Sequence, residues 1–109
     1  MLEIKPIMNS CVEEILGFKT CCGLKMFDGN LEIHVTNRGD EPVVVRSYFD
    51  LETTNGSTRI EAVMPQGEHR IEPGEVIAFY THMDEQAWSR VRRLVFHDTQ
   101  GNEYSAYLA

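Results

Sequence analysis

The sequence predicts an all-β protein in which two antiparallel sheets pack face to face. Three observations support this fold class. Seven short segments have the composition of strands, turn residues separate them at short intervals after residue 30, and helical periodicity is nearly absent. At 109 residues the chain is expected to form one domain, residues 1–109.

The first 30 residues have the weakest pattern. Residues 2–8 (LEIKPIM) are expected to form a strand, and Pro6 places it at a sheet edge because proline has no amide hydrogen. Residues 10–16 can form a short helix, since Ser10 and Glu13 have the spacing of a capping box. The glycine-interrupted stretch around them favours strand or loop slightly more than helix.

Apolar and polar side chains alternate through the next strands, at residues 31–37, 42–52 and 58–64. Asn55-Gly56 is a hairpin signal between the last two. Tyr48, Asp50 and Glu52 are expected to point outward. The side chains expected to point inward are Leu31, Ile33, Val35, Val43, Val45, Ser47, Phe49, Leu51, Ile60, Ala62 and Met64.

Pro65 is expected to end the third of these strands and to begin a polar connection. A strand over residues 75–82 follows, and Asp84 can then cap a helical turn near residues 84–90. Strands at 92–98 and 103–108 complete the set of seven. In the strand over residues 75–82 either Ile77 and Phe79 or Val76, Ala78 and Tyr80 can face inward, and we expect Ile77 and Phe79 to do so. In the last two strands the inward side chains are expected to be Leu94, Phe96, Tyr104, Ala106 and Leu108, with Arg93, Val95 and His97 outward.

Three stretches give the chain a family resemblance. In VTNRGDEPVVV a strand ends at Asn37 and a turn leads into the next strand. The stretch IEPGEVIAFY has a Pro-Gly-Glu entry to a later strand. The stretch VFHDTQGNEY contains a hairpin turn with Asp98 and Gly101. With these turns, residues 30–109 resemble immunoglobulin-like and fibronectin type III-like domains, which implies a seven-stranded immunoglobulin-like β-sandwich. The antibody pattern of paired cysteines around a tryptophan is missing, because Trp88 falls in the helical turn and no cysteine follows residue 22.

Composition disfavours several classes of partner. Seventeen acidic against ten basic residues give a net charge of -7, which repels nucleic acid. No apolar run approaches the roughly 18 residues of a membrane-spanning helix. The N-terminus MLEIKPIMNS lacks the pattern of a signal peptide, and three cysteines fit a reducing compartment, so we expect a cytoplasmic protein.

Two groups of residues have side chains that can bind a metal. Cys11, Cys21 and Cys22, with His34, lack the paired spacing of a zinc site, and buried packing explains the cysteines better; a thiol-based metal or redox site stays an alternative. The loop carboxylates that calcium would use also fit ordinary turns. They are Asp28, Asp40, Glu41, Asp98 and Glu103. We therefore expect neither a metal nor a cofactor.

The chain has no Gly-x-Ser-x-Gly motif and no glycine-rich phosphate loop, so no catalytic residue is predicted. We expect a non-catalytic binding or accessory module that contacts another protein. The binding residues predicted are Tyr48, Trp88 and Tyr107, because such side chains combine apolar area with a polar group. Carbohydrate binding through the same aromatic residues is a second alternative. The sequence predicts neither the partner nor the oligomeric state.

Overall fold

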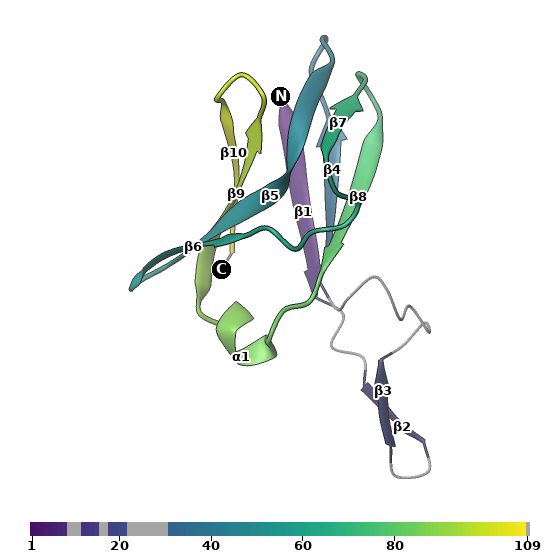
Figure 1. The fold of residues 1–109 in the computed structure, drawn as a ribbon, viewed down its shortest axis with the longest axis vertical. Helices are drawn as coiled ribbons and strands as arrows, with labels where there is room; N and C mark the ends of the chain where they lie inside the picture. Colours follow the sequence, from purple (N-terminus) through teal and green to yellow (C-terminus); the bar gives the residue numbers. More distant parts are fainter. Residues whose placement is uncertain (9–11, 16–17, 22–30, 109) are drawn as a thin grey trace.

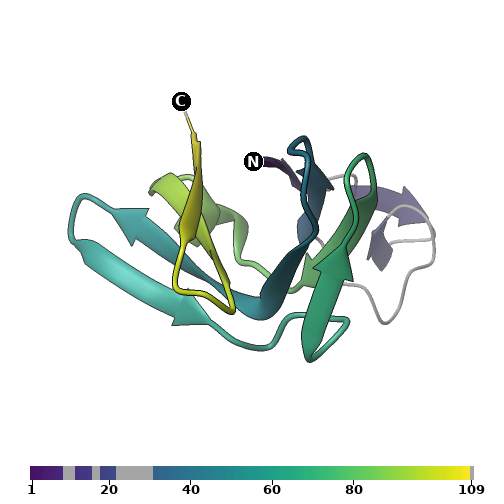
Figure 2. The ribbon, with the colours of Figure 1, turned by 90° about the horizontal axis from the view of Figure 1, so that it is seen from above.

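The computed structural model of the chain describes residues 1–8, 12–15, 18–21 and 31–108. Two antiparallel sheets, one of three strands and one of five, lie face to face (Figures 1 and 2), and the buried apolar cluster is built from strands of both. The prediction of an all-β sandwich is confirmed.

The three-stranded sheet has the order β1-β4-β8. Its strands are β1 (Leu2–Met8), β4 (Leu31–Asn37) and β8 (Val76–Thr81). β1 is an edge strand, as Pro6 predicted. The N–H of Arg38 donates to the carbonyl of Met1, so in the antiparallel register the odd residues of β1 face β4 and Pro6 faces away. The missing N–H of Pro6 therefore removes no hydrogen bond from the ladder.

The five-stranded sheet has the order β10-β9-β5-β6, and β7 pairs with the first part of β5. Its strands are β5 (Val43–Thr53), β6 (Gly56–Ile60), β7 (Glu68–Ile71), β9 (Val91–Asp98) and β10 (Glu103–Tyr107). The eleven-residue β5 therefore serves two neighbours along one edge. Its pairing with β9 is irregular between Val45 and Phe49, where β5 carries extra residues.

Two smaller elements complete the described chain. The helical turn α1 (Glu85–Trp88) is where the sequence predicted it, and the carboxylate of Asp84 caps it by accepting from the N–H of Ala87 at 3.0 Å. β2 (Val12–Ile15) and β3 (Phe18–Cys21) pair with each other. The helix weighed for residues 10–16 is therefore wrong over residues 12–15, and its other positions lie outside the described residues.

The core lies between the two sheets and follows the predicted alternation. Ile33 of β4 is fully buried, whereas its neighbours Glu32 and His34 are half-buried. The rings of Phe49 and Phe79 lie 5.4 Å and 5.2 Å from that of Phe96, joining the two sheets at the centre. Each such side chain contributes roughly 1.5–3 kcal/mol through burial. The fully buried apolar side chains include Leu31, Ile33, Val35, Val45, Phe49, Val63, Phe79, Leu94 and Phe96.

Two predictions between residues 58 and 75 are wrong. The strand expected over 58–64 ends at Ile60, and beyond it Val63 is buried while Met64 is 50% exposed, the reverse of the expected alternation. The chain leaves the five-stranded sheet there and crosses to the other sheet, where Met64 bridges to Tyr80. The sequence predicted a polar connection where the structure has strand β7. Three of its four residues are polar and only Ile71 is buried, so no apolar alternation indicated a strand.

Candidate functional site

The five-stranded sheet has an outer face, the side that points away from the three-stranded sheet. Strand pairing brings its side chains into three rows across the strands. The first row contains Tyr48, His97 and Glu103; the second contains Arg59, Asp50, Val95 and Ser105; the third contains Ser57, Glu52, Arg93 and Tyr107.

Asp50 is the centre of the first cluster on this face. Arg59 holds its carboxylate with two donors, Nε to Oδ1 at 3.0 Å and an Nη to Oδ2 at 3.4 Å. Nε2 of His97 donates to the same Oδ2 at 2.7 Å. The Tyr48 ring stacks on His97 at 5.4 Å, and the guanidinium of Arg59 lies 4.3 Å from its centre. Four side chains from three strands are thus fixed in one arrangement.

Glu52 and Arg93 form the second cluster, directly opposite each other on β5 and β9. The guanidinium makes a two-pronged contact with the carboxylate, with nitrogen–oxygen distances of 2.8 Å and 2.6 Å. The Arg93 guanidinium also lies 5.9 Å from the centre of the Tyr107 ring on β10. Tyr107 itself is 79% exposed, so one aromatic ring stands on the surface beside an oriented cation.

The ion pairs shift the ionisation of the groups on this face. The hydrogen bonds from Arg59 lower the pKa of Asp50; burial opposes this effect, and His97 adds to it. Arg93 lowers the pKa of Glu52 in the same way. Glu52, followed by Tyr107, holds the pKa of Arg93 above its ordinary value. Both carboxylates therefore stay charged, and the pairs stay intact, well below neutral pH.

Val95 forms the floor of the outer face. It is 2% exposed, yet it is not part of the core cluster between the sheets. Its register places it between Asp50 and Ser105, with Arg93 and His97 on either side along β9. The prediction that Val95 points outward is confirmed by this register, but the side chains around it exclude water. The outer face is therefore a packed layer and not a set of loose surface side chains.

The predicted binding residues have different positions. Tyr48 and Tyr107 lie on the outer face, as their alternation indicated. Trp88 lies on α1, half-buried against the core cluster, and does not join them. Sequence reasoning placed Asp50, Arg93 and His97 outward but not together, since one sequence does not reveal the register that pairs them.

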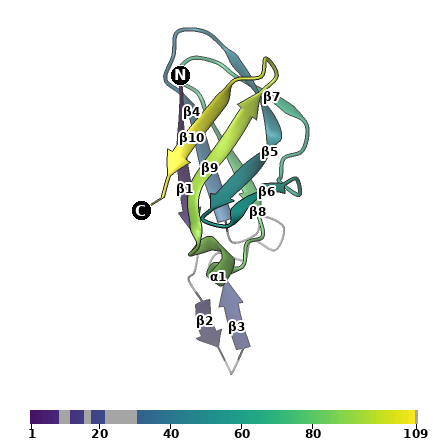
Figure 3. The same ribbon diagram turned by 90° about the vertical axis from the view of Figure 1, so that its left-hand side faces the viewer.

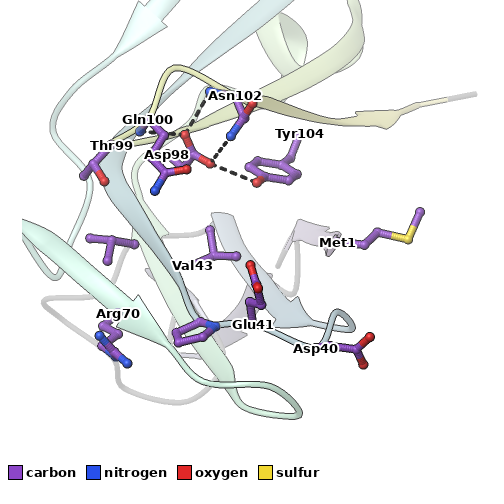
Figure 4. A pocket seen from close by; sticks show the side chains of 12 residues that line it. Met1, Asp40, Glu41, Val43, Arg70, Asp98, Thr99, Gln100, Asn102 and Tyr104 are labelled. Atoms are coloured by element: carbon purple, nitrogen blue, oxygen red, sulfur yellow. Dashed lines mark hydrogen bonds between the residues drawn. The ribbon is translucent and has the colours of Figure 1, made fainter.

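A cavity of about 610 Å³ lies at the end of the sandwich where the turns meet (Figure 4). It is lined by Asp40 and Glu41 of the β4–β5 turn, by the β9–β10 turn, and by Arg70 and Met1. Among the described residues, no group of three or more histidine, cysteine, aspartate or glutamate side chains is arranged to hold a metal ion. Asp28, one of the carboxylates weighed for calcium, lies outside the described residues.

Asp98, which lines this cavity, is occupied by hydrogen bonds within its own hairpin. Oδ1 accepts from the N–H groups of Gln100 and Asn102, and Oδ2 accepts from the Asn102 amide and the Tyr104 hydroxyl, all at 2.8–2.9 Å. Burial alone would raise the pKa of Asp98, but these donors outweigh it and lower the pKa. Burial, followed by the bond to Asp98, raises the pKa of Tyr104 to about 12. Asp98 thus organises the turn, as the sequence suggested for it and Gly101, which has a positive φ of 89°.

The structure describes one of the three cysteines. Cys11 and Cys22 lie outside the described residues, and Cys21 is described as a backbone position of β3 opposite Val12. A thiol-based metal or redox site stays a prediction. α1 spans four residues, and over the described ranges no helix has the length and apolarity of a membrane-spanning segment.

Comparison with known proteins adds no identification. The chain matches no protein-family model, no curated protein sequence and no solved structure. His97 is the candidate general base on the outer face, and Asp50 would orient it through Nε2. The ring of Tyr48, rather than its hydroxyl, contacts the imidazole, and no described side chain hydrogen-bonds to Nδ1 of His97.

Proposed function

We propose that this protein is a non-catalytic binding module that uses the outer face of its five-stranded sheet to contact another protein. The observation that carries the proposal is that Tyr48 and Tyr107 share this face, each with an arginine beside its ring. Tyrosine and arginine are enriched among the residues that dominate protein–protein binding energy. Both arginines are held by two-pronged ion pairs, so binding would immobilise few additional side chains.

Charge also supports this face. The protein carries a net charge of -7, which opposes the approach of other acidic proteins. In the three rows two arginines stand among three carboxylates, Asp50, Glu52 and Glu103, so the charge there is close to balanced. A protein surface of mixed charge can therefore approach this face at low electrostatic cost.

We also propose that the chain is related to immunoglobulin-like domains and is located in the cytoplasm. Lettered in chain order, β1, β4 and β8 match strands A, B and E, and β5, β9 and β10 match C, F and G; β6 occupies the position of C′. β7 departs from this scheme, since it pairs with β5 and not with β8. The location is supported by the odd number of cysteines.

Carbohydrate binding is less well supported. It would need rings that stack openly on a sugar, but the Tyr48 ring is already in contact with His97 and Arg59, and Trp88 packs on the core.

Site-specific photo-crosslinking in the native cell tests the proposal. A photoreactive residue replaces Ser57, which is exposed on the outer face, or Val76, which is 59% exposed on the other sheet. We expect a discrete protein adduct from position 57 and none from position 76. Equal labelling at both positions, or no protein adduct at position 57, would contradict the proposal.

A further inference from the structure

Strand β10 leaves one side of its backbone without a partner strand. At the two ends of its pairing with β9, Asp98 N–H donates to the carbonyl of Asn102 and Leu108 N–H donates to that of Arg92. In an antiparallel ladder the even residues of β10 therefore bond to β9, and Glu103, Ser105 and Tyr107 point their N–H and carbonyl groups the other way. Within the described residues no strand pairs with that side.

The two edge strands of the three-stranded sheet carry features that discourage pairing. β1 presents Pro6, without an N–H, at its free side. β8 is covered at Tyr80, where Met64 exchanges two backbone hydrogen bonds with it. β10 has no proline, no lysine and no register irregularity along its five residues. β1, which belongs to the three-stranded sheet, lies beside β10 (Figure 3), but no backbone hydrogen-bond ladder joins the two strands.

We infer that β10 pairs antiparallel with β10 of a second copy of this chain, with Ser105 on the two-fold axis. In this register Ser105 faces Ser105, and each Glu103 faces Tyr107 of the other copy. Glu103, Ser105 and Tyr107, whose backbone groups point away from β9, then all join hydrogen-bonded pairs in both strands. A register shifted along the strand would pair fewer of these residues. Tyr104 and Ala106, half-buried at the edge, face each other across the contact and lose further exposure.

Local charge complementarity along the edge selects a second copy as the occupant, and the net charge of -7 on each copy opposes this pairing and keeps it weak. The third row of one copy ends in Glu52, Arg93 and Tyr107, and the first row of the other begins with Glu103 and His97. Across the axis the two rows form one continuous row, in the order Glu52, Arg93 and Tyr107 of one copy and then Glu103 and His97 of the other. Glu103 therefore contacts the Tyr107 ring, which already lies beside the Arg93 cation. An axis at Glu103 would instead oppose two carboxylates, which is destabilising. This inference does not depend on the proposed function.

Sedimentation equilibrium of the full chain tests the pairing, from about 10 µM to about 1 mM because so small an interface is expected to be weak. The wild type should show a monomer–dimer equilibrium. Ser105→Pro removes an N–H that β9 does not use, and should weaken the dimer at least tenfold; Ser105→Ala, the matched control, should not change it. A wild type that stays monomeric, or Ser105→Pro dimers of unchanged affinity, would overturn the inference.

A cysteine variant gives a second reading if Ser105→Pro fails to fold. Ser105→Cys is made in a chain whose three native cysteines are replaced by serine. Opposed residues of a hydrogen-bonded antiparallel pair have Cα atoms about 5.5 Å apart, within disulfide range. Mild oxidation should therefore give a covalent dimer, whereas Ser57→Cys in the same background should not. No dimer from Ser105→Cys, or equal yields from both variants, would contradict the pairing.

Discussion

The guanidinium of Arg59 lies over the ring of Tyr48, 4.3 Å from its centre, while the same guanidinium holds the carboxylate of Asp50. One arginine thus fixes an aromatic residue and a charge on the outer face. Three strands contribute to the arrangement, because His97 of β9 contacts both Asp50 and Tyr48. This coupling makes the ionisation of Asp50 a sensitive measure of whether the outer face is assembled.

Arg59→Ala should raise the pKa of Asp50 towards its ordinary value of 3.8, because Arg59 is the largest cause of its depression. Arg59→Lys keeps the charge without the two-pronged geometry and should give an intermediate shift. Carboxyl carbon chemical shifts followed by NMR during a pH titration measure the effect. Arg92→Ala, which removes an exposed arginine elsewhere on β9, is the control and should leave Asp50 unchanged; an unshifted Asp50 in Arg59→Ala would refute the coupling.

Tyr104 should be the source of a late tyrosine ionisation step, with a pKa of about 12. Because the folded state holds this proton more tightly than the unfolded state, the contribution to stability is complete below about pH 10. It is lost as the pH rises towards 12. Absorbance at about 295 nm follows tyrosinate formation. Tyr104→Phe should remove the step near pH 12, and persistence of that step would show that Tyr104 is not its source.

Asp98→Asn should destabilise the fold by about 2 kcal/mol at neutral pH, since an amide nitrogen would then face donors that now meet a carboxylate. The depressed pKa of Asp98 means that its contribution is present above the unfolded pKa, near 3.8, and is lost as the pH falls through the folded value. Urea unfolding from pH 7 down to about pH 2 should therefore show a steady difference in stability between the two proteins above pH 3.8 and a shrinking difference below it. A constant difference would argue that Asp98 is not ionised in the folded protein.

Val63 and Met64 give a matched pair for the crossing between sheets. Val63→Ala should cost about 1–3 kcal/mol because this side chain is fully buried, whereas Met64→Ala, at a half-exposed position, should change stability by less than about 0.5 kcal/mol. Thermal unfolding of both variants measures the difference. The reverse order of effects would restore the original sequence expectation for residues 58–64.

The sequence was sufficient for the strands whose two faces differ. Ile33, Phe49, Phe79 and Leu94 were predicted to be buried because apolar and polar residues alternate around them, and all four are fully buried. β7 was not predicted as a strand, because its mostly exposed polar residues resemble those of a loop. Val63 was misplaced because alternation holds within a strand and fails where the chain crosses between sheets.

The outer face was predicted in part. Alternation placed Tyr48 and Asp50 outward, but Asp50 meets His97 across 47 residues of sequence. That contact depends on register and on the irregularity between Val45 and Phe49, where β5 carries extra residues. Local pattern carries no information about either, so the residues could be assigned a face but not a neighbour. Trp88 was grouped with them on chemical type alone, which says nothing about position.

The most direct test of the binding role is the effect of Tyr48→Ala combined with Tyr107→Ala on photo-crosslinking from position 57 in the native cell. If the two tyrosines anchor a partner, the adduct should fall at least tenfold while thermal unfolding shows that the fold is retained. An undiminished adduct from a folded double variant would contradict the account.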